Sequence, residues 1–190
     1  MKFNAKFIDT ALRDYYESQA LYMVSNVYLF GNGYQETDFL VVKSNNKYCY
    51  DVEIKISKAD FKADFKKTRK HDILKDGGYK TNYRKSVVQN GKRKVLPAGR
   101  LIKTDKRPNR FYFAVPEGLI LPEDVPEYAG LLYVSKSGKV TKIREGKLLH
   151  KKKLNIEKLL CRKFYFRWLD ALSAVEIVKS ELKNCMKRKK

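Results

Sequence analysis

The chain has 190 residues, of which 43% are hydrophobic and 13% aromatic, so it can bury the core of one domain and is not disordered throughout. Its 42 Lys and Arg residues outnumber 21 Asp and Glu, which gives a formal net charge of +21. This imbalance favours a polyanionic partner. Nucleic acid is favoured over a membrane surface because the basic residues are interleaved with Tyr and Phe. The alternative explanation of the charge is general solubility.

The first predicted element is a helix over residues 8–29, where apolar side chains recur at helical spacing up to the turn sequence Gly31-Asn32-Gly33. Glu17 is an acid within this helix. Most acids on a helix face solvent, so the pattern alone favours a solvated Glu17 side chain.

Residues 37–42 and 48–56 are predicted to form two strands of an antiparallel hairpin, because both are rich in β-branched and aromatic residues and the intervening Ser44-Asn45-Asn46 is a turn signal. Side chains in a strand alternate between faces, so Asp51, Glu53 and Lys55 share one face. The other face is apolar and suits a core beneath a helix. Asp38 on the first strand is expected to lie near Glu53 and Lys55.

Two carboxylates and one ammonium are the minimum equipment for metal-assisted phosphodiester cleavage. Mg²⁺ prefers oxygen ligands and keeps several waters, so Asp38 and Glu53 can hold it and leave room for a phosphate. Lys55 would stabilise the phosphate charge or orient the attacking water, whose pKa the metal lowers. The pattern Glu-x-Lys occurs three times, and only residues 53–55 combine it with an apolar strand and an upstream acid. The alternative is an edge strand with a solvated face.

A second helix is predicted to begin at Ser57, whose hydroxyl can cap free backbone amides with Asp60 as the partner acid, and to end near Gly77-Gly78. Its basic side chains would line a nucleic-acid groove if the helix packs beside the acidic residues. A solvated helix face is equally expected for any one of them. They are Lys58, Lys62, Lys66, Lys67, Arg69 and Lys70.

Residues 79–108 are interpreted as a basic insertion with one hairpin signal, two β-prone runs around Asn90-Gly91. Residues 57–110 contain 18 Lys and Arg against 5 Asp, so most of the excess charge lies here. We expect a two-stranded wing along a nucleic-acid backbone, with Tyr79 and Tyr83 either stacking on unpaired bases or packing locally. The residues assigned here to nucleic-acid binding are Arg84, Lys92, Arg93, Lys94 and Arg100.

Residues 110–116 are almost continuously apolar, which indicates a central strand. Strands at 130–134 and 139–143 follow, and residues 154–182 are predicted to form a long final helix with one apolar side. Residues 184–190 are a basic tail. We interpret residues 1–190 as one domain that carries the insertion and the tail.

The cysteine, histidine and hydropathy patterns indicate the cellular compartment of the protein. Cys49, Cys161 and Cys185 are odd in number and widely spaced, which is typical of reduced thiols, and the two histidines are too isolated for a zinc site. The sequence shows no signal-peptide pattern and no apolar run long enough to span a bilayer. We therefore expect a cytoplasmic protein that is not secreted and does not bind membranes.

The order of these elements resembles the core of the PD-(D/E)XK nuclease superfamily, and within it the MmcB-like family of DNA repair nucleases more closely than the restriction enzymes. The resemblance covers most of residues 36–145. Three stretches contribute most: VEIKISKADFKAD at 52–64, NRFYFAVPEG at 109–118, and residues 121–132. The sequence departs from the family at the 79–108 insertion and at Asp51, where an apolar residue is usual.

The resemblance implies an α/β fold with a restriction-endonuclease-like core (αβββαβ), a mixed central sheet flanked by helices. It also implies an Mg²⁺- or Mn²⁺-dependent endodeoxyribonuclease of a bacterial or phage-infected cell, acting in DNA repair, recombination or DNA processing. By the same resemblance Asp38 and Glu53 would bind the metal, Lys55 would be the catalytic lysine, and Glu17 would match a helix-one glutamate that some members add to the metal.

Several alternatives stay open. Glu36 is an additional candidate ligand, and Asp51 is either a further ligand or the point where its strand meets solvent. DNA is the expected partner, single-stranded and branched forms included, and a homodimer is compatible with the pattern. The alternative function is a nucleic-acid-binding protein that keeps the nuclease fold without cutting.

Overall fold

The computed structural model describes residues 3–30, 34, 36–80, 85–96 and 99–188. The chain forms two compact units, Met1–Leu154 and Asn155–Lys190. The first contains the sheet, and the second consists mainly of one helix, α4 (Glu157–Arg188). Each unit is described by itself.

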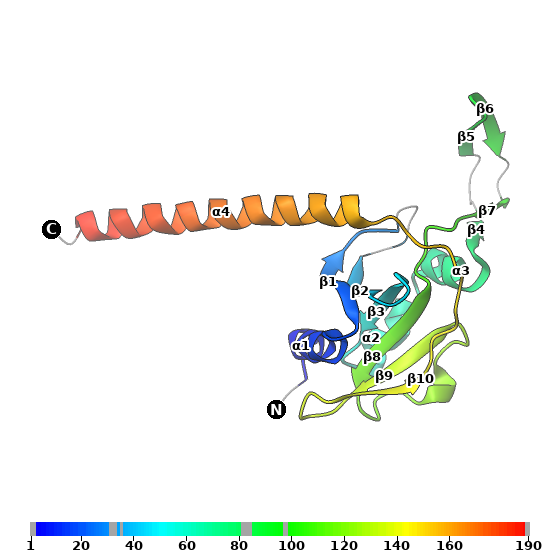
Figure 1. Ribbon diagram of the computed structural model, residues 1–190, viewed down its shortest axis with the longest axis horizontal. Coiled ribbons are helices and arrows are strands. Elements are labelled where there is room, and N and C mark those ends of the chain that lie inside the picture. The colour runs from blue at the N-terminus through cyan, green and yellow to red at the C-terminus, as the bar shows by residue number, and fades with distance from the viewer. Residues whose placement is uncertain (1–2, 31–33, 35, 81–84, 97–98, 189–190) are drawn as a thin grey trace. The chain divides into compact units, whose positions relative to one another are not determined.

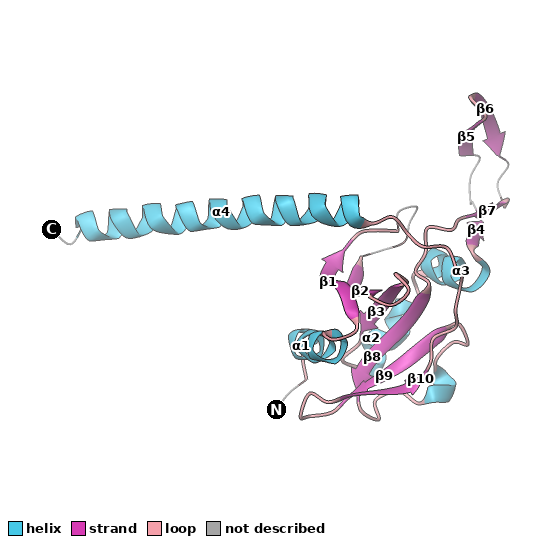
Figure 2. Cartoon of the chain, viewed as in Figure 1, coloured by secondary structure: helices cyan, strands magenta, loops and turns pink. Residues whose placement is uncertain are grey.

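A mixed sheet is the centre of the first unit (Figures 1 and 2). In the described part of the chain it has six strands in the order β1-β2-β3-β8-β9-β10. The pairs β3–β8 and β8–β9 are parallel, and the other neighbouring pairs are antiparallel. The strands are β1 (Ala20–Val27), β2 (Thr37–Lys43), β3 (Cys49–Ile54), β8 (Arg110–Pro116), β9 (Ala129–Val134) and β10 (Val140–Arg144).

Helices cover both faces of this sheet. The helix α1 (Ala5–Tyr16) packs Ile8 and Leu12 into a buried apolar cluster with Val52 and Ile54 of β3. The helices α2 (Lys58–Asp64) and α3 (Thr68–Asp76) lie on the other face, where the Phe61 ring packs 4.9 Å from that of Phe113 on β8. The structure therefore confirms a mixed α/β fold with a central sheet flanked by helices and a long C-terminal helix. A short 3₁₀ helix, Pro122–Asp124, precedes β9.

The predicted helix over residues 8–29 is wrong in its second half. The helix α1 ends at Tyr16, and β1 then pairs antiparallel with β2. Several residues in β1 are aromatic or β-branched, and partly exposed positions alternate irregularly with buried Val24 and Val27, as in an edge strand. Helical spacing of apolar residues persisted by chance across this boundary, so the pattern did not show the change.

The predicted β2–β3 hairpin and the central position of β8 are confirmed. The single helix predicted from Ser57 is two helices, interrupted at residues 65–67. Ser57 Oγ does accept a hydrogen bond from the Asp60 amide at 3.1 Å, and Gly77 ends α3 with a left-handed φ of 68°. At the interruption, the Phe65 ring packs against those of Phe61 and Phe113, which turns the chain between the two helices.

The described residues of the insertion form two short antiparallel pairs. β4 (Gly78–Lys80) pairs with β7 (Leu101–Lys103), and β5 (Lys85–Gln89) pairs with β6 (Lys92–Leu96). Asn90 and Gly91 both have positive φ, as the predicted two-residue turn requires. Tyr79 is buried with the Arg69 guanidinium 3.7 Å from its ring centre, so the expectation that Tyr79 stacks on bases is wrong. Tyr83 lies outside the described residues.

Candidate active site

The pairing of β2 with β3 brings the predicted acidic residues together. Phe39 is opposite Val52 in the register, which places Asp38 opposite Glu53. Glu53 and Lys55 point away from the apolar cluster under α1, as the alternation predicts, and both are buried. Asp38, Glu53 and Lys55 therefore lie within one site, as expected from the sequence.

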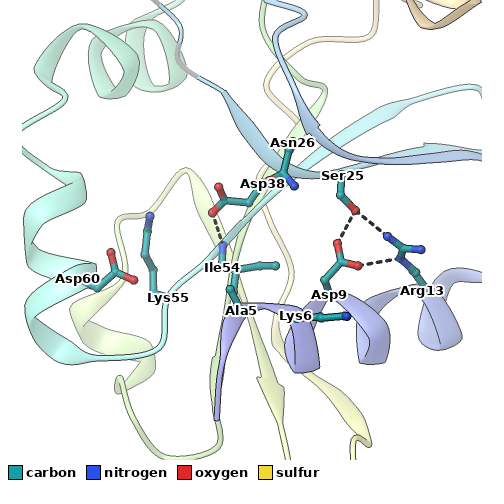
Figure 3. A pocket seen from close by; sticks show the side chains of 10 residues that line it. All are labelled: Ala5, Lys6, Asp9, Arg13, Ser25, Asn26, Asp38, Ile54, Lys55 and Asp60. Carbon is teal, nitrogen blue, oxygen red and sulfur yellow. Dashed lines mark hydrogen bonds and ion pairs between the residues drawn. The ribbon is translucent and has the colours of Figure 1, made fainter. Parts of the chain in front are cut away.

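Asp38 lines a cavity of about 490 Å³ together with Lys55 and Asp60 (Figure 3). Its Oδ2 accepts a hydrogen bond from the Ile54 amide at 2.9 Å, which fixes the carboxylate at the end of β3. Burial, and after it the neighbouring Glu53 carboxylate, raise the pKa of Asp38 to about 6. Two carboxylates held together against their repulsion are a donor set that a cation would stabilise.

Glu53 belongs to a closed arrangement of two carboxylates and two ammonium groups, which we call the charge ring: Glu53, Lys55, Asp64 and Lys70. Lys55 Nζ donates to Glu53 Oε2 at 2.9 Å and lies 3.1 Å from Asp64 Oδ1. Lys70 Nζ contacts Glu53 Oε1 and lies 3.3 Å from Asp64 Oδ2. The four formal charges cancel, so the ring can be buried with its charges intact.

The charge ring sets the protonation of its own members. Burial alone would raise the pKa of Glu53, but Lys70 and Lys55 outweigh it and hold that pKa below its usual range. Burial would likewise lower the pKa of Lys55, yet Glu53 and Asp64 raise it overall. The pKa of Asp64 is held low against burial by His71, Lys70 and Lys55. Glu53 and Lys55 are therefore both charged at neutral pH.

Two side chains outside the charge ring also contact Asp64. Lys67 Nζ lies 3.0 Å from Asp64 Oδ1, and His71 Nε2 lies 3.1 Å from Oδ2. His71 Nδ1 is in turn 2.6 Å from the Tyr128 hydroxyl. The sequence did not single out Asp64 or Lys70 as site residues. Lys70 was expected at the edge of a nucleic-acid groove, and that expectation is wrong because the residue is buried.

Asp51 occupies the same face of β3 and is fully buried, so the view that it marks the strand's contact with solvent is wrong. Tyr34 donates its hydroxyl proton to Asp51 Oδ2 at 2.5 Å, while Oδ1 has no hydrogen-bond partner among the described residues. Burial, and after it the Glu53 carboxylate, raise the pKa of Asp51 to about 8. Asp51 is therefore protonated at neutral pH, beside an ionised Glu53.

The raised pKa of Asp51 predicts a pH-dependent stability. In the unfolded chain the carboxyl titrates near 3.8, so its stabilising contribution is complete below that pH and is lost as pH rises to about 8. The Asp51→Asn variant should therefore melt higher than the parent at pH 8, with a difference that shrinks toward pH 4. Thermal unfolding across this range measures it. Asp170→Asn, at an exposed position on α4, is the control and should change neither curve.

The residues present fit one divalent ion held by two carboxylates if one ammonium group, from Lys55 or Lys70, gives up its contact with Glu53. Asp38 and Glu53 are adjacent, and Mg²⁺ is usually bound by one or two carboxylates plus waters and phosphate. Within the described ranges no group of three or more His, Cys, Asp or Glu side chains could hold a metal.

The structure does not bring the other two candidate ligands to this cavity. Glu17 is the exposed residue that follows the last turn of α1, and the α1 residues that line the cavity are Ala5, Lys6, Asp9 and Arg13. Glu36 interacts with the Tyr28 hydroxyl and raises the pKa of that group. The α1 acid that does line the cavity is Asp9, which accepts hydrogen bonds from Arg13 Nε at 2.7 Å and from the Ser25 hydroxyl.

The basic residues assigned to nucleic-acid binding differ in their exposure. Most are exposed, as that role requires: Lys58, Lys62, Lys66, Lys92, Arg93, Lys94 and Arg100. Arg69 is half-buried against Tyr79, and Arg93 Nε donates to Ser86 Oγ at 2.6 Å. Arg84 lies outside the described residues.

Comparisons with known proteins leave the family open. No protein-family model and no curated protein matches the chain. Among solved structures, the chain is similar to a protein of unknown function from Silicibacter pomeroyi, with a TM-score of 0.49 and 18% sequence identity over 90% of this chain and 88% of that chain. In the described part of the chain, no helix has a stretch long and apolar enough to cross a bilayer. Function must therefore follow from the chemistry of the site.

Proposed function

We propose that this protein is an Mg²⁺- or Mn²⁺-dependent nuclease that hydrolyses DNA phosphodiester bonds. The observation that carries the proposal is the juxtaposition of Asp38 with Glu53 beside Lys55, at a cavity of about 490 Å³. The half-buried Asp38 carboxylate and Lys55 line this cavity, and the buried Glu53 carboxylate accepts a hydrogen bond from Lys55, an arrangement suited to holding a phosphate and a cation together.

Each residue of the site has a separate task in this proposal. Asp38 and Glu53 would hold the metal, which when bound lowers the pKa of a water and neutralises charge on the phosphate. Lys55 keeps its proton because Glu53 and Asp64 stabilise the ammonium, so it can stabilise a phosphate oxygen but cannot serve as a base. The Ile54 amide fixes the direction of the Asp38 carboxylate.

The order of the elements supports a restriction-endonuclease-like core of the PD-(D/E)XK type. One helix, three antiparallel strands, a helical segment and a further strand follow one another as α1, β1, β2, β3, α2 with α3, and β8. This is the αβββαβ order that the MmcB-like resemblance implies. The net charge of +21 and the exposed lysines of α2 and of the β5–β6 hairpin support DNA as the substrate.

A second candidate function rests on one observation. Both oxygens of Glu53 are already in contact with ammonium groups, from Lys55 and Lys70. These contacts neutralise the carboxylate without any metal, as expected of a DNA-binding protein that keeps this fold and does not cleave. Such a protein would bind DNA with strong salt dependence and would be insensitive to chelation.

Cleavage assays with and without metal separate the two functions. Labelled linear, single-stranded, flapped and four-way DNA, with a matched RNA, are incubated with protein and Mg²⁺, Mn²⁺ or chelator. We expect cleavage products from at least one DNA substrate when Mg²⁺ or Mn²⁺ is present, and none when the chelator is present. Salt-sensitive binding in every lane, without product under any condition, would instead establish the non-cleaving function.

Glu17 provides a matched test of the metal site. Because Glu17 is exposed and outside the cavity, Glu17→Gln should cleave DNA within about twofold of the parent rate, the change expected when no transition-state contact is lost. The measurement is the initial rate at saturating Mg²⁺. A loss comparable with that of an Asp38 variant would instead place Glu17 at the metal.

A further inference from the structure

The helix α4 carries apolar side chains that the chain leaves exposed. It has 32 residues, and several of its large apolar side chains are about half exposed, among them Phe164, Trp168, Val175 and Val178. Exposed apolar side chains in such a number are typical of a surface that binds another protein surface. Without such a partner, a helix of this length would lack the stabilisation that packing of an apolar face provides.

One series of apolar residues on α4 follows a spacing of alternately three and four positions, and the exposed Leu159, Tyr165, Phe166, Leu172 and Ile177 lie outside it. The series is Cys161, Phe164, Trp168, Ala171, Val175 and Val178, which we call the α4 seam. The sequence carries Leu182 and Cys185 at the next two positions of the same spacing. A repeat of 3.5 residues sustained over more than three heptads is the pattern of a helix that winds around another helix.

We propose that α4 pairs with the α4 of a second copy of this chain in an antiparallel two-stranded coiled coil. The partner must match the seam in length and period. The other described α-helices, α1, α2 and α3, have 12, 7 and 9 residues, and α1 and α2 already pack against the sheet. A second copy supplies a helix of equal length with the same repeat.

Charges beside the seam favour the antiparallel orientation. When Trp168 packs opposite Val178 of the partner subunit, Arg167 lies beside Glu181 of the partner subunit, and the two-fold axis repeats this pair. Leu172 then meets the partner's Leu172 at the centre. In a parallel pair Arg167 would lie beside the apolar side chain of the partner's Leu172. No pair of residues beside the seam would then combine opposite charges. Specificity therefore comes from Arg167 and Glu181.

Solution mass with matched variants tests the pairing. The 190-residue protein should have twice its 22.3 kDa chain mass when measured by light scattering coupled to size exclusion. Val175→Glu places a carboxylate in the seam and should raise the dissociation constant by at least about 100-fold. Ile177→Glu introduces the same charge at an equally exposed position outside the seam and should leave the dimer intact. A monomeric parent, or equal effects of both variants, would overturn the proposal.

The native cysteines test the orientation. The seam spacing places Cys161 opposite Cys185 of the partner subunit in the antiparallel register, whereas the two Cys161 residues would be about 36 Å apart. Mild oxidation should therefore give a Cys161 to Cys185 crosslink by peptide mapping, and Cys49 is buried and should not compete. A crosslink between two Cys161 residues would show a parallel pair and refute the proposed register.

A charge exchange provides the final control on the register. Arg167→Glu should weaken the dimer by about 10-fold, because two carboxylates then face each other at each end of the seam. Combining it with Glu181→Arg restores the opposite charges and should recover most of the affinity. Failure of the double variant to recover would mean that these two residues do not meet. None of these measurements depends on nuclease activity.

Discussion

Replacing Asp38 by asparagine is expected to lower metal-dependent DNA cleavage by more than about 100-fold. Loss of a group that only supports a metal ligand typically costs 10–100-fold, so loss of a ligand itself should exceed that range. Asparagine keeps the shape and an oxygen that can still accept the Ile54 amide, so folding should be preserved. Single-turnover rates over a series of Mg²⁺ and Mn²⁺ concentrations measure the effect.

The matched control is Asp60→Asn. Asp60 lines the same cavity, but its carboxylate accepts a hydrogen bond from the Ile56 amide at 3.4 Å, before the start of α2. This variant should retain the parent rate within a few-fold, an effect of about 1 kcal/mol or less. An Asp38→Asn protein that cuts as fast as the parent would remove Asp38 from the mechanism, and equal losses in both variants would point to a general change in the cavity.

Replacing Lys70 by methionine should be the most destabilising change in the charge ring. Methionine fills the space but leaves Glu53 and Asp64 sharing the cations that remain. Removing one partner from a buried ion pair typically costs about 3–5 kcal/mol. Chemical denaturation of the parent and the variant at neutral pH measures the loss in the free energy of unfolding. The control, Lys66→Met, removes an exposed ammonium four positions away and should stay within about 0.5 kcal/mol.

A charge-balanced double variant shows whether the ring acts as a unit. Asp64→Asn alone should also destabilise, because Lys55 and Lys70 then share the single carboxylate of Glu53. Combining Lys70→Met with Asp64→Asn removes one charge of each sign and keeps the Glu53–Lys55 pair. The double loss should therefore be smaller than the two single losses together by about 1–3 kcal/mol. Simple additivity would show that the four residues act independently.

The core of the site could be predicted because strand alternation is a local property. Two residues apart on one strand, Glu53 and Lys55 must share a face, and the turn at residues 44–46 determines that β2 folds back on β3. Asp38 follows from that register. The Asn90-Gly91 turn was predictable for the same reason, since its backbone requirement is set by those two residues.

The remaining features depend on tertiary packing that no local pattern encodes. Lys70 was one of many lysines in a basic segment, and only the docking of α3 against β8, with Lys70 Nζ 4.9 Å from the Phe111 ring, makes it a buried partner of Glu53. Asp64 looked like an ordinary helix acid until the interruption after α2 directed it toward the ring. Residues 20–27 were predicted as helix because the spacing of their apolar residues does not reveal that they pair with β2.

The parallel pairing of β3 with β8 shapes the order in which this protein can fold. Glu53 and Lys70 are 17 positions apart, whereas Cys49 and Asn109, which join the start of β3 to the residue before β8, are 60 apart. Closing a longer loop costs more chain entropy and slows contact formation. The four residues of the charge ring can therefore approach one another along the chain before β8 joins the sheet, and the docking of β8 then buries them. Shortening the insertion should speed the folding of the sheet while leaving the charge ring unchanged.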